Sequence, residues 1–222
     1  MTAVIEEDVV HQVERKPLLR GWLHAFTCPM VLAASIVFLC LAPSLELKGA
    51  MVVYLVTSLI MFGNSAVYHI FNWSPPVKAV LRRVDHSNIY LFIAGTYTPL
   101  SVALLAGGSR LAILLVIWIA AVAGIAVSIF WLTAPRWITA GLYVFIGWAA
   151  VWWMPEFWNV GGPAIVWLLI AGGVVYSIGA FFYAKKWPNP WPGVFGFHEM
   201  FHLCTVLAAA CHFVAIGLAV MR

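Results

Sequence analysis

The sequence predicts an all-α membrane protein: a bundle of seven transmembrane helices, with the N-terminus in the cytoplasm and the C-terminus outside. Three observations support this prediction: the composition, the number of long apolar segments and the distribution of basic residues. The 222 residues are 64% hydrophobic and only 9% charged, and the mean hydropathy is +0.98. A water-soluble domain of this size needs more charge to cover its surface.

Seven apolar segments are each long enough to cross a bilayer as a helix, which takes about 20 residues. They lie at about 23–42, 49–71, 86–106, 111–131, 137–154, 163–183 and 198–220. The connections between them are short, so residues 23–222 are expected to form one membrane domain.

Residues 1–22 form the only sizeable polar segment. Within it, Ile5, Val9 and Val13 recur every fourth residue, which indicates a short amphipathic helix at the membrane interface. Acidic residues precede its first basic cluster and no short apolar core follows them, so the pattern is not that of a cleavable signal peptide. We therefore expect a cytoplasmic or interfacial N-terminal segment.

Basic residues fall unequally on the two sides of the predicted membrane domain. One side holds Arg15, Lys16, Arg20, Lys78, Arg82, Arg83, Arg136, Lys185 and Lys186, and the other holds Lys48, Arg110 and Arg222. Because the side richer in Lys and Arg faces the cytoplasm, this bias gives the orientation stated above. The same residues are scattered between apolar segments, which excludes a basic face for nucleic acid.

Polar residues within the apolar segments gather at three segment ends. They are Asn64, Ser65 and His69 near the end of 49–71, Asp85 and His86 at the start of 86–106, and His198, Glu199 and His202 at the start of 198–220. With alternating helix directions, all three ends lie at the cytoplasmic face. Ionisable groups at membrane depth are costly, and their default interpretation is functional.

The spacing of the histidines indicates a metal site. His198 and His202 are four residues apart, so on a helix they lie on one face, about one turn apart. Catalytic zinc takes three protein ligands and leaves a position for water, and His69 can supply the third imidazole. Asp85 is then predicted to orient the water or accept its proton, and Ser65 to hydrogen-bond the water or a substrate oxygen.

Several structural alternatives stay open at this point. Any single histidine in a membrane helix can serve packing alone, and Asp85 beside two arginines can be a helix N-cap. His86 can be a ligand, a neighbour of the site or an interfacial residue. His24 is interpreted as interfacial, and His212 lies too far beyond His202 for the same site and is expected to pair with a neighbouring helix.

The sequence His198-Glu199-x-x-His202 also satisfies the zincin pattern, in which the glutamate is the general base. An intramembrane metalloprotease is therefore a competing interpretation. Such enzymes take their third ligand from an aspartate further along the chain, but no Asp or Glu follows Glu199. This interpretation also returns to His69.

Taken together, these motifs resemble the hemolysin III family, the bacterial branch of the progestin and adipoQ receptor family. The matching stretches are Lys16–Trp22, Ser65-x3-His69, Asp85–Tyr90 continuing through Ala94–Pro99, and His198-Glu199-x-x-His202 with Cys211-His212-Phe213. The resemblance covers nearly the whole chain. It implies seven transmembrane helices, a cytoplasmic N-terminus and zinc held by His69, His198 and His202, with Ser65 and Asp85 beside it.

The resemblance also has implications for function. The wider superfamily includes alkaline ceramidases, which suggests a zinc-dependent hydrolase acting on lipid amide bonds. The resemblance implies a multi-pass protein of the bacterial cytoplasmic membrane. Its expected partners are the lipid bilayer and a lipid or fatty-acid ligand in the bundle. A receptor-like or membrane-homeostasis sensor with structural zinc is the alternative. A pore-forming hemolysin is a third, disfavoured because a secreted pore-former must survive in water.

Overall fold

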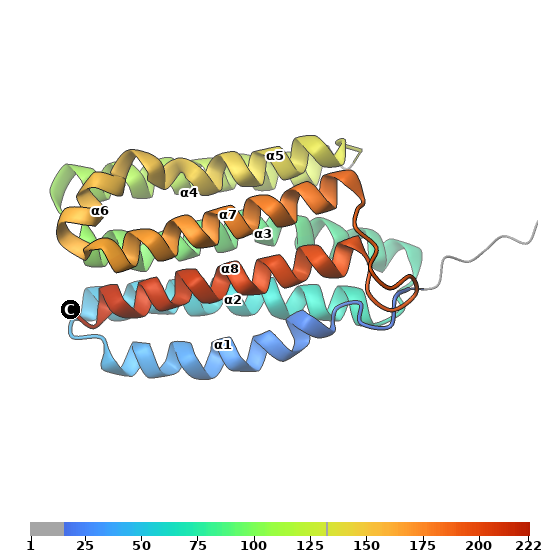
Figure 1. Cartoon of the computed structure of the whole chain (residues 1–222), viewed down its shortest axis with the longest axis horizontal. Coiled ribbons are helices and arrows are strands. Elements are labelled where there is room, and N and C mark those ends of the chain that lie inside the picture. The colour runs from blue at the N-terminus through green and yellow to red at the C-terminus, as the bar shows by residue number, and fades with distance from the viewer. Residues whose placement is uncertain (1–15, 132) are drawn as a thin grey trace, which may run out of the picture.

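The computed structural model describes residues 16–131 and 133–222, and within them every long element is a helix (Figure 1). The helices are α1 (Trp22–Leu41), α2 (Leu45–Ile70), α3 (Pro75–Leu104), α4 (Gly107–Phe130), α5 (Arg136–Gly147), the 3₁₀ helix η1 (Trp148–Trp153), α6 (Met154–Gly161), α7 (Pro163–Lys185) and α8 (Phe197–Val220). The amphipathic helix predicted around Ile5, Val9 and Val13 lies outside the described residues.

Six helical segments are long and apolar enough to cross a membrane: α1, α2, α4, the continuous run from α5 to α6, α7 and α8. This confirms an all-α membrane protein. α3 has 30 residues but is more polar, with charged residues in its first three turns and hydroxyl and amide groups further along. That α3 makes a seventh crossing stays a prediction, as does the side of the membrane on which each terminus lies.

Three helices form the interior of the bundle. α2 packs against α1 and α3, α3 also contacts α4 and α8, and α7 lies along α8. Half of the membrane-spanning stretch is buried in both α2 and α8, against 17% in α1. The polar residues that the sequence singles out therefore lie on the helices that are most enclosed by protein.

α3 begins eleven residues earlier than the apolar segment predicted at 86–106. Pro75 and Pro76 occupy its first turn, where a missing N–H costs nothing. Asp85 consequently lies ten residues inside the helix, and the interpretation of Asp85 as a helix N-cap is wrong. Helix 137–154 is also longer than predicted, because the chain continues through η1 and α6 to Gly161.

One end of the bundle collects the chemistry-bearing residues. The end of α2, the start of α5, the end of α7 and the start of α8 all lie at the right-hand end in Figure 1, whereas the C-terminus lies at the other. The basic residues of the larger predicted group that fall in the described chain belong to this first end, which we call the basic end. It is the end that the positive-inside rule assigns to the cytoplasm.

Candidate metal centre

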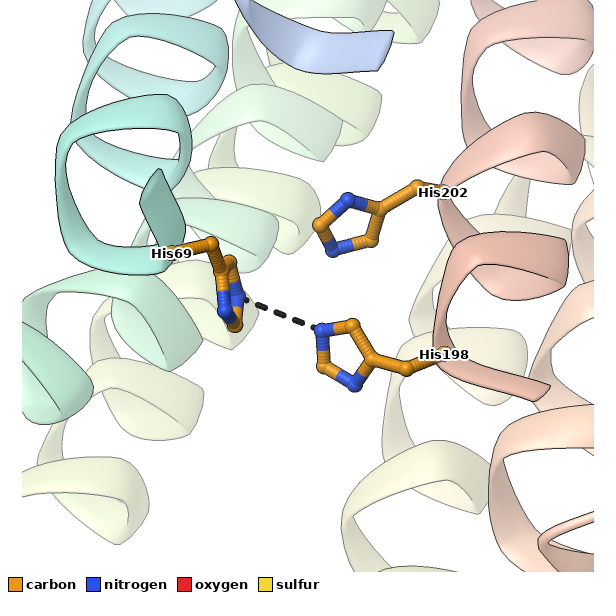
Figure 2. Close-up of side chains that lie close together, drawn as sticks. All are labelled: His69, His198 and His202. Carbon is orange, nitrogen blue, oxygen red and sulfur yellow. Dashed lines mark hydrogen bonds between the residues drawn. The ribbon is translucent and has the colours of Figure 1, made fainter. Parts of the chain in front are cut away.

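Three histidines from two helices point toward a common space (Figure 2). His69 lies in the last turn of α2, and His198 and His202 lie in the first two turns of α8. One ring nitrogen of each lies within 4.8 Å of the other two. The Nε2 atoms of His69 and His198 are 3.2 Å apart.

This arrangement fits a zinc ion. Zinc–nitrogen bonds of about 2.0–2.1 Å in a tetrahedron place two ligand nitrogens about 3.3 Å apart. The pair from His69 and His198 already has this separation, and the nitrogen of His202 needs only a small ring movement to match it. Three imidazole ligands leave a fourth position of a tetrahedral zinc ion for another ligand.

The helix geometry explains why these residues meet. His198 and His202 share one face of α8 because they are one turn apart. α2 keeps its helical form through Ile70, so His69 is carried to the level at which α8 starts. The triad therefore joins two helices whose histidines are 129 residues apart in sequence.

Asp85 and Ser65, the two residues predicted to act beside the metal, both lie near the triad. Asp85 Oδ2 is 3.5 Å from His69 Nε2, and both Asp85 and Ser65 line a cavity together with His198 and His202. This cavity offers ≈ 20 Å³ to the centre of a water molecule, and one water needs about 10–15 Å³ by that measure. The site therefore has room for a water molecule next to a carboxylate.

The Glu199 carboxylate makes structural contacts away from the triad. One carboxylate oxygen pairs with the Arg20 guanidinium, and the other accepts a hydrogen bond of 2.8 Å from the backbone N–H of Gly196. One oxygen thus caps the start of α8, and the other joins α8 to the segment before α1. This geometry does not support the general-base role that the zincin interpretation gives to Glu199.

His24 is a site residue that the sequence analysis missed. It was expected at the interface, but it is completely buried in α1. Its ring stacks on His202, with centroids 3.9 Å apart and planes inclined by 6°, and it lines the same cavity. A signal was available, because the start of the first apolar segment lies at the same end as the starts of 86–106 and 198–220.

The other two histidines in question have distinct positions. His86 lines the cavity of the triad and also a neighbouring polar cavity. His212 lies deep in the bundle, where its Nε2 is 3.2 Å from the Leu169 carbonyl of α7. The expected pairing of His212 with a neighbouring helix is therefore observed.

The segment before α1 holds the ends of the two triad helices together. The Lys16 ammonium donates to the Phe71 carbonyl at 2.7 Å, just after α2, and Leu18 donates to the Gly193 carbonyl at 3.0 Å, shortly before α8. Partial burial and the charges of Lys78 and Arg20 lower the pKa of Lys16. We call residues 16–21 the clamp.

An apolar cavity adjoins the site inside the bundle. Met61, Ile89, Tyr143 and Phe201 line both this cavity and the cavity of the triad. The centre of a water molecule can occupy ≈ 70 Å³ of this apolar cavity. Aromatic and aliphatic side chains make up most of its wall. The apolar cavity is therefore adjacent to the cavity of the triad.

The sequence also matches known proteins. The family model described as "Haemolysin-III related" matches residues 13–213. Hemolysin-3 of Bacillus cereus is 33% identical over 170 residues, which are 75% of this chain and 73% of that protein. The Hemolysin-3 homolog of Bacillus subtilis is 32% identical over 132 residues, 59% of this chain and 61% of the homolog.

A more distant relative comes from an animal. The adiponectin receptor protein of Drosophila melanogaster is 25% identical over 221 residues, covering 88% of this chain and 49% of the receptor. The family model covers nearly the whole chain, and the fold is that of an all-helical membrane protein. These two findings establish the family. The chain belongs to the haemolysin-III related family of multi-pass membrane proteins.

Proposed function

We propose that this protein is a zinc-dependent membrane hydrolase that cleaves an amide bond in a lipid. The observation that carries the proposal is a buried carboxylate, Asp85, beside three histidines, in a cavity that has room for water and adjoins an apolar cavity. We place the protein in the bacterial cytoplasmic membrane, with residues 23–222 as its membrane domain and the triad near the cytoplasmic surface.

The chemistry divides between the metal and the side chains around it. Zinc held by His69, His198 and His202 would supply a Lewis acid and lower the pKa of water to about 7. Asp85 is positioned to accept the proton of the attacking water. The Ser65 hydroxyl, in the same cavity, is positioned to hydrogen-bond the water or the substrate carbonyl, as a group that orients a reactant does.

The substrate class follows from the adjoining space. The apolar cavity shares four lining residues with the cavity of the triad, so an acyl chain within it would bring its first carbonyl group toward Asp85. Because the bilayer core is as apolar as this cavity, the cavity would contribute packing contacts and position rather than a hydrophobic driving force. The same cavity suits a fatty acid as product or ligand.

The test is turnover of a lipid-amide library by purified protein with zinc present, chelated and restored. We expect His202→Ala to lose zinc and turnover together, and Asp85→Asn to keep zinc and lose turnover by about 10²-fold or more. Turnover that survives complete removal of zinc would rule this mechanism out.

A sensor with a structural zinc is the second candidate, and one observation favours it. The triad lies between α2 and α8, near the contacts that the clamp makes with the ends of these helices, so a metal there would stiffen the basic end. This function predicts that Asp85→Asn leaves both zinc and biological activity intact. The one variant therefore separates the two functions.

A further inference from the structure

A second polar cavity lies at the basic end, next to the cavity of the triad. It is enclosed by residues of α3, of α4 and the turn after it, of α5 and of α7. Its wall contains three cationic side chains and three hydroxyl groups, from Arg82, Arg83, Arg136, Ser128, Thr139 and Tyr183. His86 and Tyr183 line both cavities, but the two have different chemistry.

The charge in this second cavity is positive. Among residues 16–131 and 133–222, no carboxylate lines it. The ion pairs found among the described residues, at Arg20–Glu199, His69–Asp85 and Arg110–Glu46, involve none of its three arginines. Guanidinium groups gathered around one space repel one another, and an anion in that space relieves the repulsion.

One of the three arginines is held in place by aromatic rings. The Arg136 guanidinium lies 5.4 Å from the centroid of the Tyr183 ring and 5.6 Å from that of Phe197. Both distances are within the range of cation–π attraction. This arrangement fixes the charge at the cavity wall and leaves its N–H groups available, because cation–π contact uses the face of the guanidinium.

A buried hydroxyl group adds a neutral polar side chain to the wall. Ser128 is only 7% exposed, and its hydroxyl lies close to the hydroxyls of Tyr90 and Tyr143. The three arginines therefore remain the feature that indicates an anion in this cavity.

We propose that this cavity binds a phosphate group. Arginines recognise phosphate through paired N–H groups, and the Ser128 hydroxyl adds a neutral donor. Trp131, which also lines the cavity, is about half exposed, as expected at the level of lipid headgroups. The phosphate belongs either to an anionic phospholipid or to a soluble phosphate, and the site requires no zinc.

The experiment measures two kinds of phosphate on the full-length protein in detergent. Calorimetry with inorganic phosphate tests the soluble source, and native mass spectrometry with phosphatidylglycerol against phosphatidylcholine tests the lipid source. We expect binding in at least one arm, with preference for the anionic lipid in the second. Binding of phosphatidylglycerol alone identifies the headgroup as the source.

Two double variants, each of which removes two positive charges, test whether phosphate binds in the cavity or is only attracted by the net positive charge of the protein. Arg82→Gln with Arg136→Gln removes two charges that line the cavity, and Lys185→Gln with Lys186→Gln removes two charges at the nearby end of α7 that do not line it. We expect the arginine variant to bind phosphate about tenfold more weakly or worse, and the lysine variant to stay within about twofold. Equal losses in the two variants, or no binding in either arm, would overturn the proposal.

Ser128→Ala tests the same site without any change of charge. We expect it to weaken phosphate binding about threefold, and this variant decides alone if the arginine variant does not fold. Unchanged affinity in Ser128→Ala would then count against the site. His202→Ala should bind phosphate like the wild type, so that failure of the hydrolase proposal and failure of this one remain distinguishable.

Discussion

Two buried carboxylates lie close to the histidine triad, and their neighbours separate their roles. Glu199 is enclosed by donors, the Arg20 guanidinium and the Gly196 N–H. Asp85 instead faces the imidazole of His69 and the cavity. The sequence motif alone favours Glu199 as the reacting group, because it sits between the two histidines. The contacts favour Asp85.

Glu199→Gln is therefore expected to act on stability and not on the metal. The variant keeps an acceptor for Gly196 but leaves the partly buried Arg20 without its counter-charge, which costs about 1–3 kcal/mol. We expect a lower melting temperature in detergent with zinc content unchanged. A stable variant that has lost only hydrolysis would instead restore the zincin interpretation.

His24 is expected to act through its stacking on His202. His24→Ala removes a ring that limits the orientations of a ligand, and groups that orient ligands contribute about 10- to 100-fold to metal affinity. We expect a loss near the lower end of that range, measured by competition with a chelator. His24→Phe keeps the stacked ring and should bind zinc nearly as well as the wild type.

His24→Phe also tests whether His24 is itself a metal ligand. If His24 were itself a ligand, His24→Phe would lose as much affinity as His24→Ala, and the stacking role would be wrong.

At the scale of single residues, the sequence predicted which histidines meet but not everything around them. His69, His198 and His202 could be found because helix periodicity and alternating helix directions place them at one level. His24 belongs to the same level, but nothing in the sequence shows toward which neighbour its helix face turns. The cavity at Arg82, Arg83 and Arg136 depends on contacts among four helices, which spacing along one chain does not encode.

At the scale of elements, hydropathy located the apolar stretches better than the helix ends. The predicted segment 86–106 begins where the chain becomes apolar, whereas α3 begins at Pro75. A helix continues past the apolar boundary as long as its residues favour helical geometry, and Lys, Arg and Leu do so. The extra turns carry Arg82 and Arg83 and bring Asp85 inside the helix.

Close contact between α3 and α4 depends on Gly124. A Cβ atom at this position would lie 2.4 Å from the ring of Tyr90, which is fully buried. Gly124→Ala therefore forces the helices apart or displaces the ring, at a cost of about 1–3 kcal/mol. We expect a lower melting temperature in detergent.

Gly141→Ala is the matched control for this prediction. It also lies inside a helix, but no atom comes within 4 Å of its added Cβ, so the substitution should be neutral or slightly stabilising. Similar losses in Gly124→Ala and Gly141→Ala would show that helix contact is not the cause.

At the scale of the whole molecule, the fold brings distant parts of the chain to one end of the bundle. The clamp, the end of α2, the first turns of α3 and the start of α8 all contribute to the centre or to its support. The all-helical class and the grouping of polar residues followed from the sequence. The order of helix packing did not, because apolar faces turned to lipid and apolar faces turned to protein have similar compositions.

Zinc is consequently expected to stabilise the whole bundle. A ligand that binds only the folded state adds about 4 kcal/mol at a thousandfold excess over its dissociation constant, and here the ligands come from α2 and α8, 129 residues apart. Adding zinc to metal-free protein should raise the melting temperature in proportion to the logarithm of free zinc above saturation, and chelation should reverse the rise. His69→Ala, which removes the only ligand on α2, should melt at the same temperature with or without zinc. A wild-type melting temperature that zinc and chelator both leave unchanged would contradict a metal link between the two helices.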